Sequence, residues 1–393
     1  MQPIDRTSRL AALLIVATVA EAMLLLLPVY VGALVDGLSL SDNQLGILAS
    51  ADLAGISLAT FSAFFWIHRV DWRKACSIFF VLLLLANIGS LFTTEFFLLT
   101  SLRTAAGLAG GAAYALALAG ICRTVREDRN AALMVCGQVI FGSVGAFLLP
   151  VVSSEWQLNA VYLYMVVWVA CALLLVLFYF PENPGVAPSA ADNVRPSAAN
   201  NTQKLFAIAG TGFYFLTVGA VWAFLERIAR DAGLDSEQVS WSLGMGYLIS
   251  LLGSGAAAWL GMRLGTAKPM LVSGVVQITM LFLFTRLDQY QSAYSAFFAI
   301  NAVFQFFWSY IIAYQIVVFS RIDRTGQFVA FYGTSMHLAL AIGPFIGAML
   351  VKGGNYSSVL SFGMVTLAFC YTCYLLTIYL NYNKSVSVEV ACD

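Results

Sequence analysis

The amino-acid sequence predicts an all-α polytopic membrane protein. Of its 393 residues, 61% are hydrophobic and only 10% are charged, whereas soluble domains carry about 25% charged residues. Apolar runs of about 20 residues, the length that crosses a bilayer as a helix, recur along the whole chain. The formal net charge is zero, so the composition gives no indication of a nucleic-acid partner.

Twelve apolar runs predict twelve membrane helices. The first begins near Leu10 and is too long for a cleaved signal peptide. The predicted spans are 10–35, 43–67, 74–94, 96–122, 130–152 and 159–180, followed by 205–229, 239–262, 268–285, 292–319, 327–351 and 357–382.

The longest polar stretch, Pro181–Lys204, is rich in Pro, Ala, Ser and Asn, a composition typical of a flexible linker. It divides the chain into an N-terminal six-helix bundle (1–180), a linker (181–204) and a C-terminal six-helix bundle with a short tail (205–393). Gly/Pro-rich helices lie at corresponding places in the two halves, near Pro150 and Pro344. Such an internal echo is typical of a duplicated transporter.

Basic residues concentrate in alternate loops, after the second, fourth, eighth and tenth predicted spans. The loops between them are mainly acidic, with Arg230 and Arg286 as exceptions. Because basic loops stay on the cytoplasmic side, both termini are expected in the cytoplasm.

The run Ser101–Ala119 is apolar but contains Arg103 about two turns inside the predicted fourth span. A guanidinium in hydrocarbon costs roughly 2.5–3.5 kcal/mol on insertion scales, so Arg103 is expected to face a cavity, a carboxylate or a substrate. The alternative is an arginine that snorkels to the interface. Gly107 and Gly111 follow at one-turn spacings and predict close helix packing.

Three other ionisable residues lie deep in predicted spans: Glu21, Asp52 and His337. Buried charges are expected to pair, and Glu21 and Asp52 are the acidic candidates for Arg103. This cluster is either functional or a structural polar lock between helices. His337 is either a site residue or a neutral core histidine.

Polar and aromatic side chains mark a candidate substrate-binding surface on the tenth span. Asn301 and Gln305 share one helical face, with Trp308 close to it. Gln138 on the fifth span and Tyr247 on the eighth are lesser candidates.

Composition excludes several chemistries. His68 and His337 are the only histidines, and no CxxC pair is flanked by histidines, so no metal site or other cofactor is expected. The chain contains no Walker A loop and no H-E-x-x-H motif. A membrane-embedded enzyme, the alternative from a different class, is therefore disfavoured.

Six plus six helices, cytoplasmic termini and a central linker together resemble the major facilitator superfamily over essentially the whole chain. The stretch Arg103-Thr-Ala-Ala-Gly107 is similar to the family's R-x-x-x-G pattern on helix 4, where the family places a functional arginine. The stretch Gly343-Pro344-x-x-Gly347 is similar to the G-P-x-x-G hinge pattern. In drug/proton antiporters, however, that pattern lies on helix 5 rather than helix 11.

The loop between helices 2 and 3 departs from the family signature G-x-x-x-D-R-x-G-R-R. Here it reads WIHRVDWRKA, which keeps Arg69 and Arg73 but puts His68 near the position of the acid. Asp71 is the candidate substitute in a gating role with these two arginines.

Glu226 and Arg227 lie near the outer end of helix 7, in the stretch VWAFLERIARDAGL. This stretch is similar to bacterial members of the drug-antiporter-like branch. The two residues are expected to form an interfacial pair or an element of a gate.

The resemblance implies a monomeric secondary transporter in a bacterial inner membrane, working by alternating access on a small organic molecule. It places helices 1, 4, 7 and 10 around a central cavity, so Glu21 and Arg103 are expected there. Because deep carboxylates can titrate, the proton is the expected coupling ion, with Glu21 first and Asp52 second as its site. Export of an amphipathic compound is preferred; uptake of an organic anion bound through Arg103 is the alternative.

Overall fold

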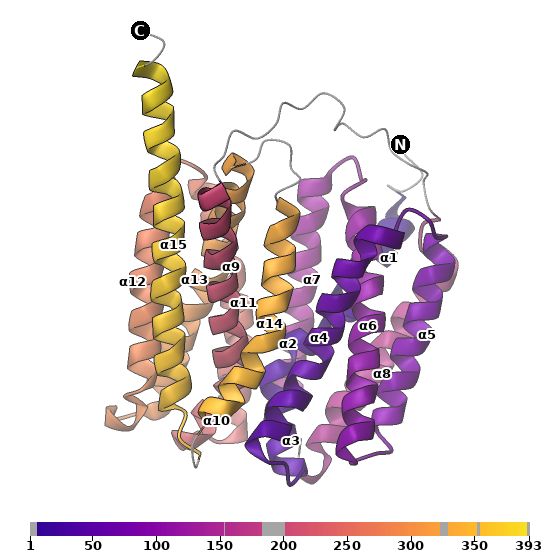
Figure 1. The fold of residues 1–393 in the computed structure, drawn as a ribbon. Coiled ribbons are helices and arrows are strands. Elements are labelled where there is room, and N and C mark those ends of the chain that lie inside the picture. The colour runs from indigo at the N-terminus through magenta and orange to yellow at the C-terminus, as the bar shows by residue number, and fades with distance from the viewer. Residues whose placement is uncertain (1–5, 153, 183–200, 323–328, 352–353, 391–393) are drawn as a thin grey trace.

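The computed structural model describes residues 6–152, 154–182, 201–322, 329–351 and 354–390, most of which form α-helices. Two bundles stand side by side, one from each part of the sequence (Figure 1). We call them the N-half (α1 to α8) and the C-half (α9 to α15). Eleven helices in the described residues are long and apolar enough to cross a membrane, and shorter apolar segments make up the first span.

The N-half consists of α1 (Thr7–Ala20), α2 (Ala22–Leu25), α3 (Leu27–Gly37), α4 (Asp42–Trp66), α5 (Trp72–Ser90), α6 (Phe96–Ile121), α7 (Glu127–Leu148) and α8 (Ser154–Tyr179). The C-half consists of α9 (Asn201–Ala223), α10 (Leu225–Asp231), α11 (Ser236–Leu260), α12 (Ala267–Phe284), the short 3-10 helix η3 (Leu287–Gln289), α13 (Ala293–Ile322), α14 (Val329–Leu350) and α15 (Ser357–Val390). The predicted all-helical fold in two halves is confirmed.

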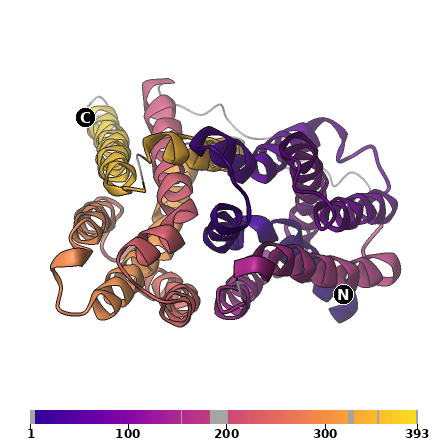
Figure 2. The ribbon, with the colours of Figure 1, turned by 90° about the horizontal axis from the view of Figure 1, so that it is seen from below.

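The two faces of the bundle differ in which chain segments they carry. Helices α1 and α9 begin, and α15 ends, on the face that we call the terminus face, at the top of Figure 1. Helices α3 and α10 lie at the other end, which we call the opposite face. The halves meet where α4 packs on α14, α7 on α11 and α3 on α10, and Figure 2 shows the two bundles from the opposite face.

Capping boxes fix the start of the second membrane helix in each half. Ser41 begins α4 with Gln44 as its reciprocal partner, and Asp235 begins α11 with Gln238. In each box, the side chain of the capping residue accepts a hydrogen bond from the backbone N–H of the glutamine, and the glutamine side chain accepts one from the backbone N–H of the capping residue. Both helices therefore start sharply at the opposite face.

The first span is interrupted twice, which corrects the predicted continuous helix over 10–35. Helix α1 ends at Ala20 and α2 ends at Leu25, and the backbone leaves helical geometry at the residues that follow, Glu21 and Leu26. Pro28 then occupies the first turn of α3, a position that tolerates a residue without a backbone N–H. The predicted helix over 205–229 is likewise interrupted, at Phe224.

Glycines make the closest helix crossings in both halves. A Cβ on Gly107 of α6 would lie 2.0 Å from the carbonyl oxygen of Asp52 on α4. A Cβ on Gly253 of α11 would lie 2.0 Å from the carbonyl oxygen of Phe306 on α13. Small residues allow this approach of two backbones, which supplies much of the packing energy between helices in lipid.

The predicted linker 181–204 lies mostly outside the described residues. Helix α9 begins at Asn201, so the last part of that predicted linker is helical. At the other end of the C-half, α15 continues to Val390, beyond the predicted end at 382.

Candidate functional site

An imidazole and a carboxylate from different halves meet in the membrane interior. Nε2 of His337 on α14 lies 2.9 Å from Oε1 of Glu21, at the first interruption of helix 1. The two side chains are only 10% and 6% exposed. This contact joins the halves through two groups that can both exchange protons.

The second ring nitrogen of His337 defines the chemistry of this pair. Nδ1 lies 2.9 Å from the carbonyl oxygen of Gly333, which can only accept, so Nδ1 carries a hydrogen. Nε2 then either accepts a hydrogen bond from protonated Glu21 or donates one, as imidazolium, to the carboxylate. In both cases the pair holds a single proton between Nε2 and Oε1.

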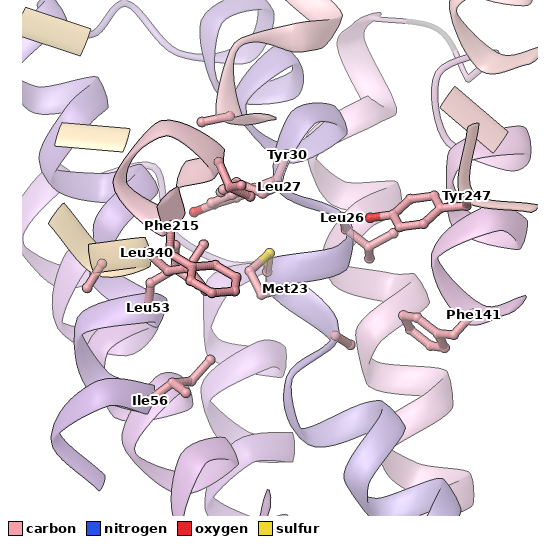
Figure 3. Close-up of a cluster of buried hydrophobic side chains, with 14 of the residues drawn as sticks. Met23, Leu26, Leu27, Tyr30, Leu53, Ile56, Phe141, Phe215, Tyr247 and Leu340 are labelled. Carbon is pink, nitrogen blue, oxygen red and sulfur yellow. The ribbon is translucent and has the colours of Figure 1, made fainter. Parts of the chain in front are cut away.

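Aromatic and apolar side chains surround the Glu21–His337 pair. The Tyr114 ring on α6 lies edge-on to the His337 ring, with 6.2 Å between centroids. The cluster in Figure 3 continues along helix 1 with Met23 and Leu26 from the N-half, and it includes Leu340 from the C-half. Water is therefore largely excluded from the side of the pair that faces the opposite face.

Of the two acidic partners predicted for Arg103, the structure places Asp52 beside it, whereas Glu21 contacts His337. Arg103 is fully buried within the N-half, where its Nη1 lies 3.8 Å from Oδ1 of Asp52. Its Nη2 donates a hydrogen bond of 3.1 Å to the side-chain oxygen of Asn87. The geometry matches the expected pairing of buried charges, but it is a contact between α4, α5 and α6 rather than a contact at the seam of the halves.

Two tyrosines extend this buried cluster to α3. The guanidinium of Arg103 lies 5.0 Å from the ring centroid of Tyr162 on α8, an arrangement in which a cation is attracted by the ring face. The Tyr162 hydroxyl lies 3.3 Å from the hydroxyl of Tyr30 on α3. The cluster thus ties α3 to the interior of the N-half.

Charged side chains join the halves at the opposite face. Arg227 on α10 lies 2.8 Å from Oδ2 of Asp36 on α3, and it also donates a hydrogen bond to the carbonyl oxygen of Gly32. Glu226 is buried beneath, 3.1 Å from Arg227 and 3.3 Å from Arg230. Glu226 and Arg227 therefore lie where a gate would need them, although a gating role itself stays a prediction.

Arg73, in the first turn of α5, contacts the chain just after α8. Nε of Arg73 donates to the carbonyl oxygen of Phe180 at 2.6 Å, and its Nη1 lies 3.1 Å from Glu182. The Asp71 side chain caps α5 by accepting from the backbone N–H of Lys74, and Arg69 is exposed. The gating role predicted for these three residues stays untested.

The polar face predicted on the tenth span packs mainly inside the C-half. Asn301 is fully buried and donates its amide hydrogen to the carbonyl oxygen of Ser242 on α11. Gln305 is buried beside it. Trp308 is partly exposed, and its indole Nε1 has no hydrogen-bond partner among the described residues. The Trp308 indole nitrogen is itself buried, so a substrate-binding role for these three residues stays a prediction.

The two lesser candidates are both used in packing. The Gln138 amide approaches the Ala17 carbonyl oxygen within the N-half at 3.4 Å. The Tyr247 hydroxyl donates across the halves to the carbonyl oxygen of Leu25.

The predicted hinge glycines lie at helix crossings. Gly111 packs against Ile56 of α4, in line with the contact made by Gly107. Gly343 packs against Gly219 of α9, and Gly347 packs against the Phe224 ring. Pro344 lies inside α14, which continues through it. These contacts explain why the residues are small; motion about them stays a prediction.

Sequence reasoning missed six participants: Gly32, Asp36, Asn87, Tyr114, Tyr30 and Tyr162. No signal in the sequence links Asp36 to Arg227, because the pair joins separate halves. Asn87 carried a weak signal, as a lone amide within an apolar span. No group of three or more metal-binding side chains occurs in the described residues.

Comparison with known proteins decides the family. The model of the Major Facilitator Superfamily matches the sequence twice, over residues 10–206 and 207–389. The chain belongs to this superfamily. The superfamily's two matches correspond to the N-half and the C-half, and no curated protein matches the sequence.

Solved structures of transporters share this superfamily fold. The chain is similar to a D-xylose–proton symporter (15% identity, TM-score 0.71, 92% of this chain and 96% of that one). It is also similar to a human organic anion transporter (13% identity, TM-score 0.68, 93% of this chain and 99% of that one). A third similar structure comes from work on proton-dependent oligopeptide transporters (12% identity, TM-score 0.73, 96% of this chain and 97% of that one). The superfamily and these neighbours identify a transporter rather than an enzyme.

Proposed function

We propose that this protein is a proton-coupled secondary transporter and that the Glu21–His337 pair carries the coupling proton. The observation that supports this most is the 2.9 Å contact between proton-exchanging groups of different halves. Alternating access requires such contacts between halves to form and break during the cycle. Two of the three similar structures are also named for proton-linked transport.

The proton changes the attraction between the halves. With one proton in the pair, Glu21 and His337 are held either by opposite charges or by a strong hydrogen bond. A second proton yields a neutral acid beside an imidazolium, which removes the charge attraction. Proton binding thus biases the equilibrium between a joined and a separated arrangement.

We expect protons to reach the pair from the terminus face in this conformation. Gly333 lies one helical turn from His337 toward that face, and no described heavy atom lies within 4 Å of a Cβ placed on it. On the other side, apolar contacts and the Arg227–Asp36 ion pair close the opposite face. The basic loops support a cytoplasmic terminus face in a bacterial inner membrane, so this conformation faces the cytoplasm.

The preferred cargo is a neutral or cationic amphipathic compound moving outward. The surroundings of Glu21 are apolar and aromatic, and Glu21 can attract a cationic group when His337 is drawn away. Uptake of an anion through Arg103 is less well supported, because Arg103 is committed to Asp52 inside the N-half. We expect Glu226 and Arg227 to gate the opposite face.

Flux in proteoliposomes tests the proposal, with the lipophilic cation tetraphenylphosphonium as the first probe and a metabolite panel to follow. A pH step of one unit supplies about 1.4 kcal/mol per proton, enough for roughly tenfold accumulation when one proton exchanges for one substrate. Glu21→Gln should abolish this accumulation yet keep exchange of labelled for unlabelled probe. The matched control is Glu237→Gln, on an exposed residue of α11.

Two results would contradict the proposal. If a transported probe moves at the same rate with and without the pH step, and a protonophore changes nothing, proton coupling is wrong. If Glu21→Gln accumulates the probe as well as Glu237→Gln, the proton site lies elsewhere, and Asp52 becomes the next candidate.

A further inference from the structure

Tyr247 joins the C-half to a one-turn helix of the N-half. Its hydroxyl donates to the carbonyl oxygen of Leu25, the last residue of α2. Carbonyl groups at a helix C-terminus lack a partner within the helix, so Leu25 offers an acceptor that a continuous helix would have used internally. The interruption at Leu26 therefore creates the docking point for Tyr247.

The ring of Tyr247 is held in one place. A Cβ on Gly142 of α7 would lie 2.9 Å from Cζ of Tyr247, so only glycine leaves room for the phenol there. The Trp222 ring on α9 packs edge-on at 5.3 Å between centroids. Figure 3 shows the Tyr247 hydroxyl directed at the segment that carries Leu26.

Helix α2 is therefore attached to the C-half at both of its ends. Glu21 immediately precedes α2 and contacts His337 of α14, and Leu25 ends it and contacts Tyr247 of α11. The segment between the two attachments is a single helical turn bounded by interruptions on both sides. Such a short segment cannot shift at one end and keep its geometry at the other.

We propose that Tyr247 is a latch that holds the opposite face closed, and that α2 couples this latch to the Glu21–His337 bridge. Separation of α11 from α2 breaks the hydrogen bond between the Tyr247 hydroxyl and the Leu25 carbonyl oxygen. Release of either end of α2 weakens the attachment at the other end. Tyr247 thus acts as a positioning residue between the halves and not as a substrate ligand. The coupling rests on the proposed role of the Glu21–His337 bridge.

Distances between the halves test the latch without substrate or gradient. Spin labels at exposed residues Ser39 and Glu237, beside the opposite face, report its opening in lipid nanodiscs by pulsed electron double resonance. Tyr247→Phe keeps the ring and removes only the hydroxyl. The ratio of open to closed molecules should rise about fivefold, the factor expected from one hydrogen bond.

The matched control is Tyr164→Phe. Tyr164 also donates its hydroxyl to a backbone carbonyl, that of Phe141 at 3.1 Å, but both residues belong to the N-half. Its loss should leave the distance distribution unchanged. The reaction rate of a cysteine at buried Leu27 with an impermeant thiol reagent detects open molecules that are too few to resolve as a second distance.

A double-mutant cycle tests the coupling through α2. In a Glu21→Ala background, which leaves no hydrogen-bonding group for His337, the effect of Tyr247→Phe should fall below about twofold, because one end of α2 is already released. A full effect in both backgrounds would overturn the coupling. The latch would be overturned if Tyr247→Phe had the same distance distribution and the same thiol reaction rate as the wild type or Tyr164→Phe. Neither result bears on proton coupling, which the flux assay decides separately.

Discussion

Arg103 and Asp52 illustrate how differently the two halves stabilise their interiors. In the N-half, buried opposite charges join neighbouring helices. In the C-half, neutral groups do so: Gln277 donates to Tyr214 at 3.2 Å and accepts from Tyr371. Removal of one member of a buried ion pair leaves an uncompensated charge, which is more costly than loss of a neutral partner.

Replacement of Arg103 should therefore destabilise the protein more than replacement of Gln277. We expect Arg103→Ala to lower stability by about 3–5 kcal/mol and Gln277→Ala by about 1–3 kcal/mol. Arg103→Lys should recover part of the loss, since an ammonium keeps the charge but lacks the planar fork. Thermal unfolding in detergent ranks the stabilities of these variants. An Arg103→Ala protein as stable as the wild type would show that the ion pair contributes nothing to stability.

At the scale of helices, glycine placement determines how closely the bundles pack. Gly107 touches the backbone of α4, whereas Gly255 on α11 has no described heavy atom within 4 Å of a Cβ. Both glycines lie inside long helices. Substitution of each by alanine therefore distinguishes the effect of steric crowding from the effect of helix propensity.

Alanine at these two positions should have opposite effects. Gly255→Ala should be neutral or stabilising by up to about 1 kcal/mol, because alanine favours a helix. Gly107→Ala must push α6 away from α4, which should lower the melting temperature and the yield of monodisperse protein. Equal melting temperatures for the two variants would mean that the α4–α6 crossing tolerates an added methyl group.

Helix positions were predictable from the sequence because they depend on local apolar length. The predicted span 96–122 corresponds to α6, Phe96–Ile121. The interruptions of the first span were not predictable, because Glu21 leaves helical geometry where it meets a partner from the other half. Pro28 was visible in the sequence, but its position in a first turn depends on that interruption.

The candidate site was predictable residue by residue but not pair by pair. Depth in an apolar span identified Glu21, Asp52, Arg103 and His337 correctly as buried ionisable residues. Their partners depend on which helix faces which. The packing of α6 on α4 brings Arg103 to Asp52. A sequence pattern that contains an arginine does not reveal which helix or cavity that arginine faces.

At the scale of the whole molecule, closure is concentrated on the face that carries α3 and α10. Ser143 on α7 donates to the carbonyl oxygen of Gly244, and Ser240 on α11 donates to the carbonyl oxygen of Phe147 at 2.6 Å. These bonds join α7 and α11 across the halves, and the Arg227–Asp36 ion pair joins α10 to α3. Together they predict that reagents reach the midplane from the terminus face in this conformation.

Cysteine labelling in intact cells should establish the orientation. In a background without the seven native cysteines, a cysteine at Ser39 should react with an impermeant thiol reagent added outside. A cysteine at Arg126 should react only after the membrane is permeabilised, because basic loops stay in the cytoplasm. Both residues are exposed, and the reverse pattern would invert the proposed orientation and the direction of access.

The order of the charged residues along the chain also decides when each pair can form as the ribosome makes the protein. Helices α4 and α6 follow closely on one another, so Asp52 can meet Arg103 before any of the C-half has been synthesised. Glu21 lies in the first span and His337 in the eleventh. The nascent first span therefore remains in the bilayer without its histidine partner until nearly the whole chain has been translated, and the two halves gain their midplane bridge only as synthesis ends.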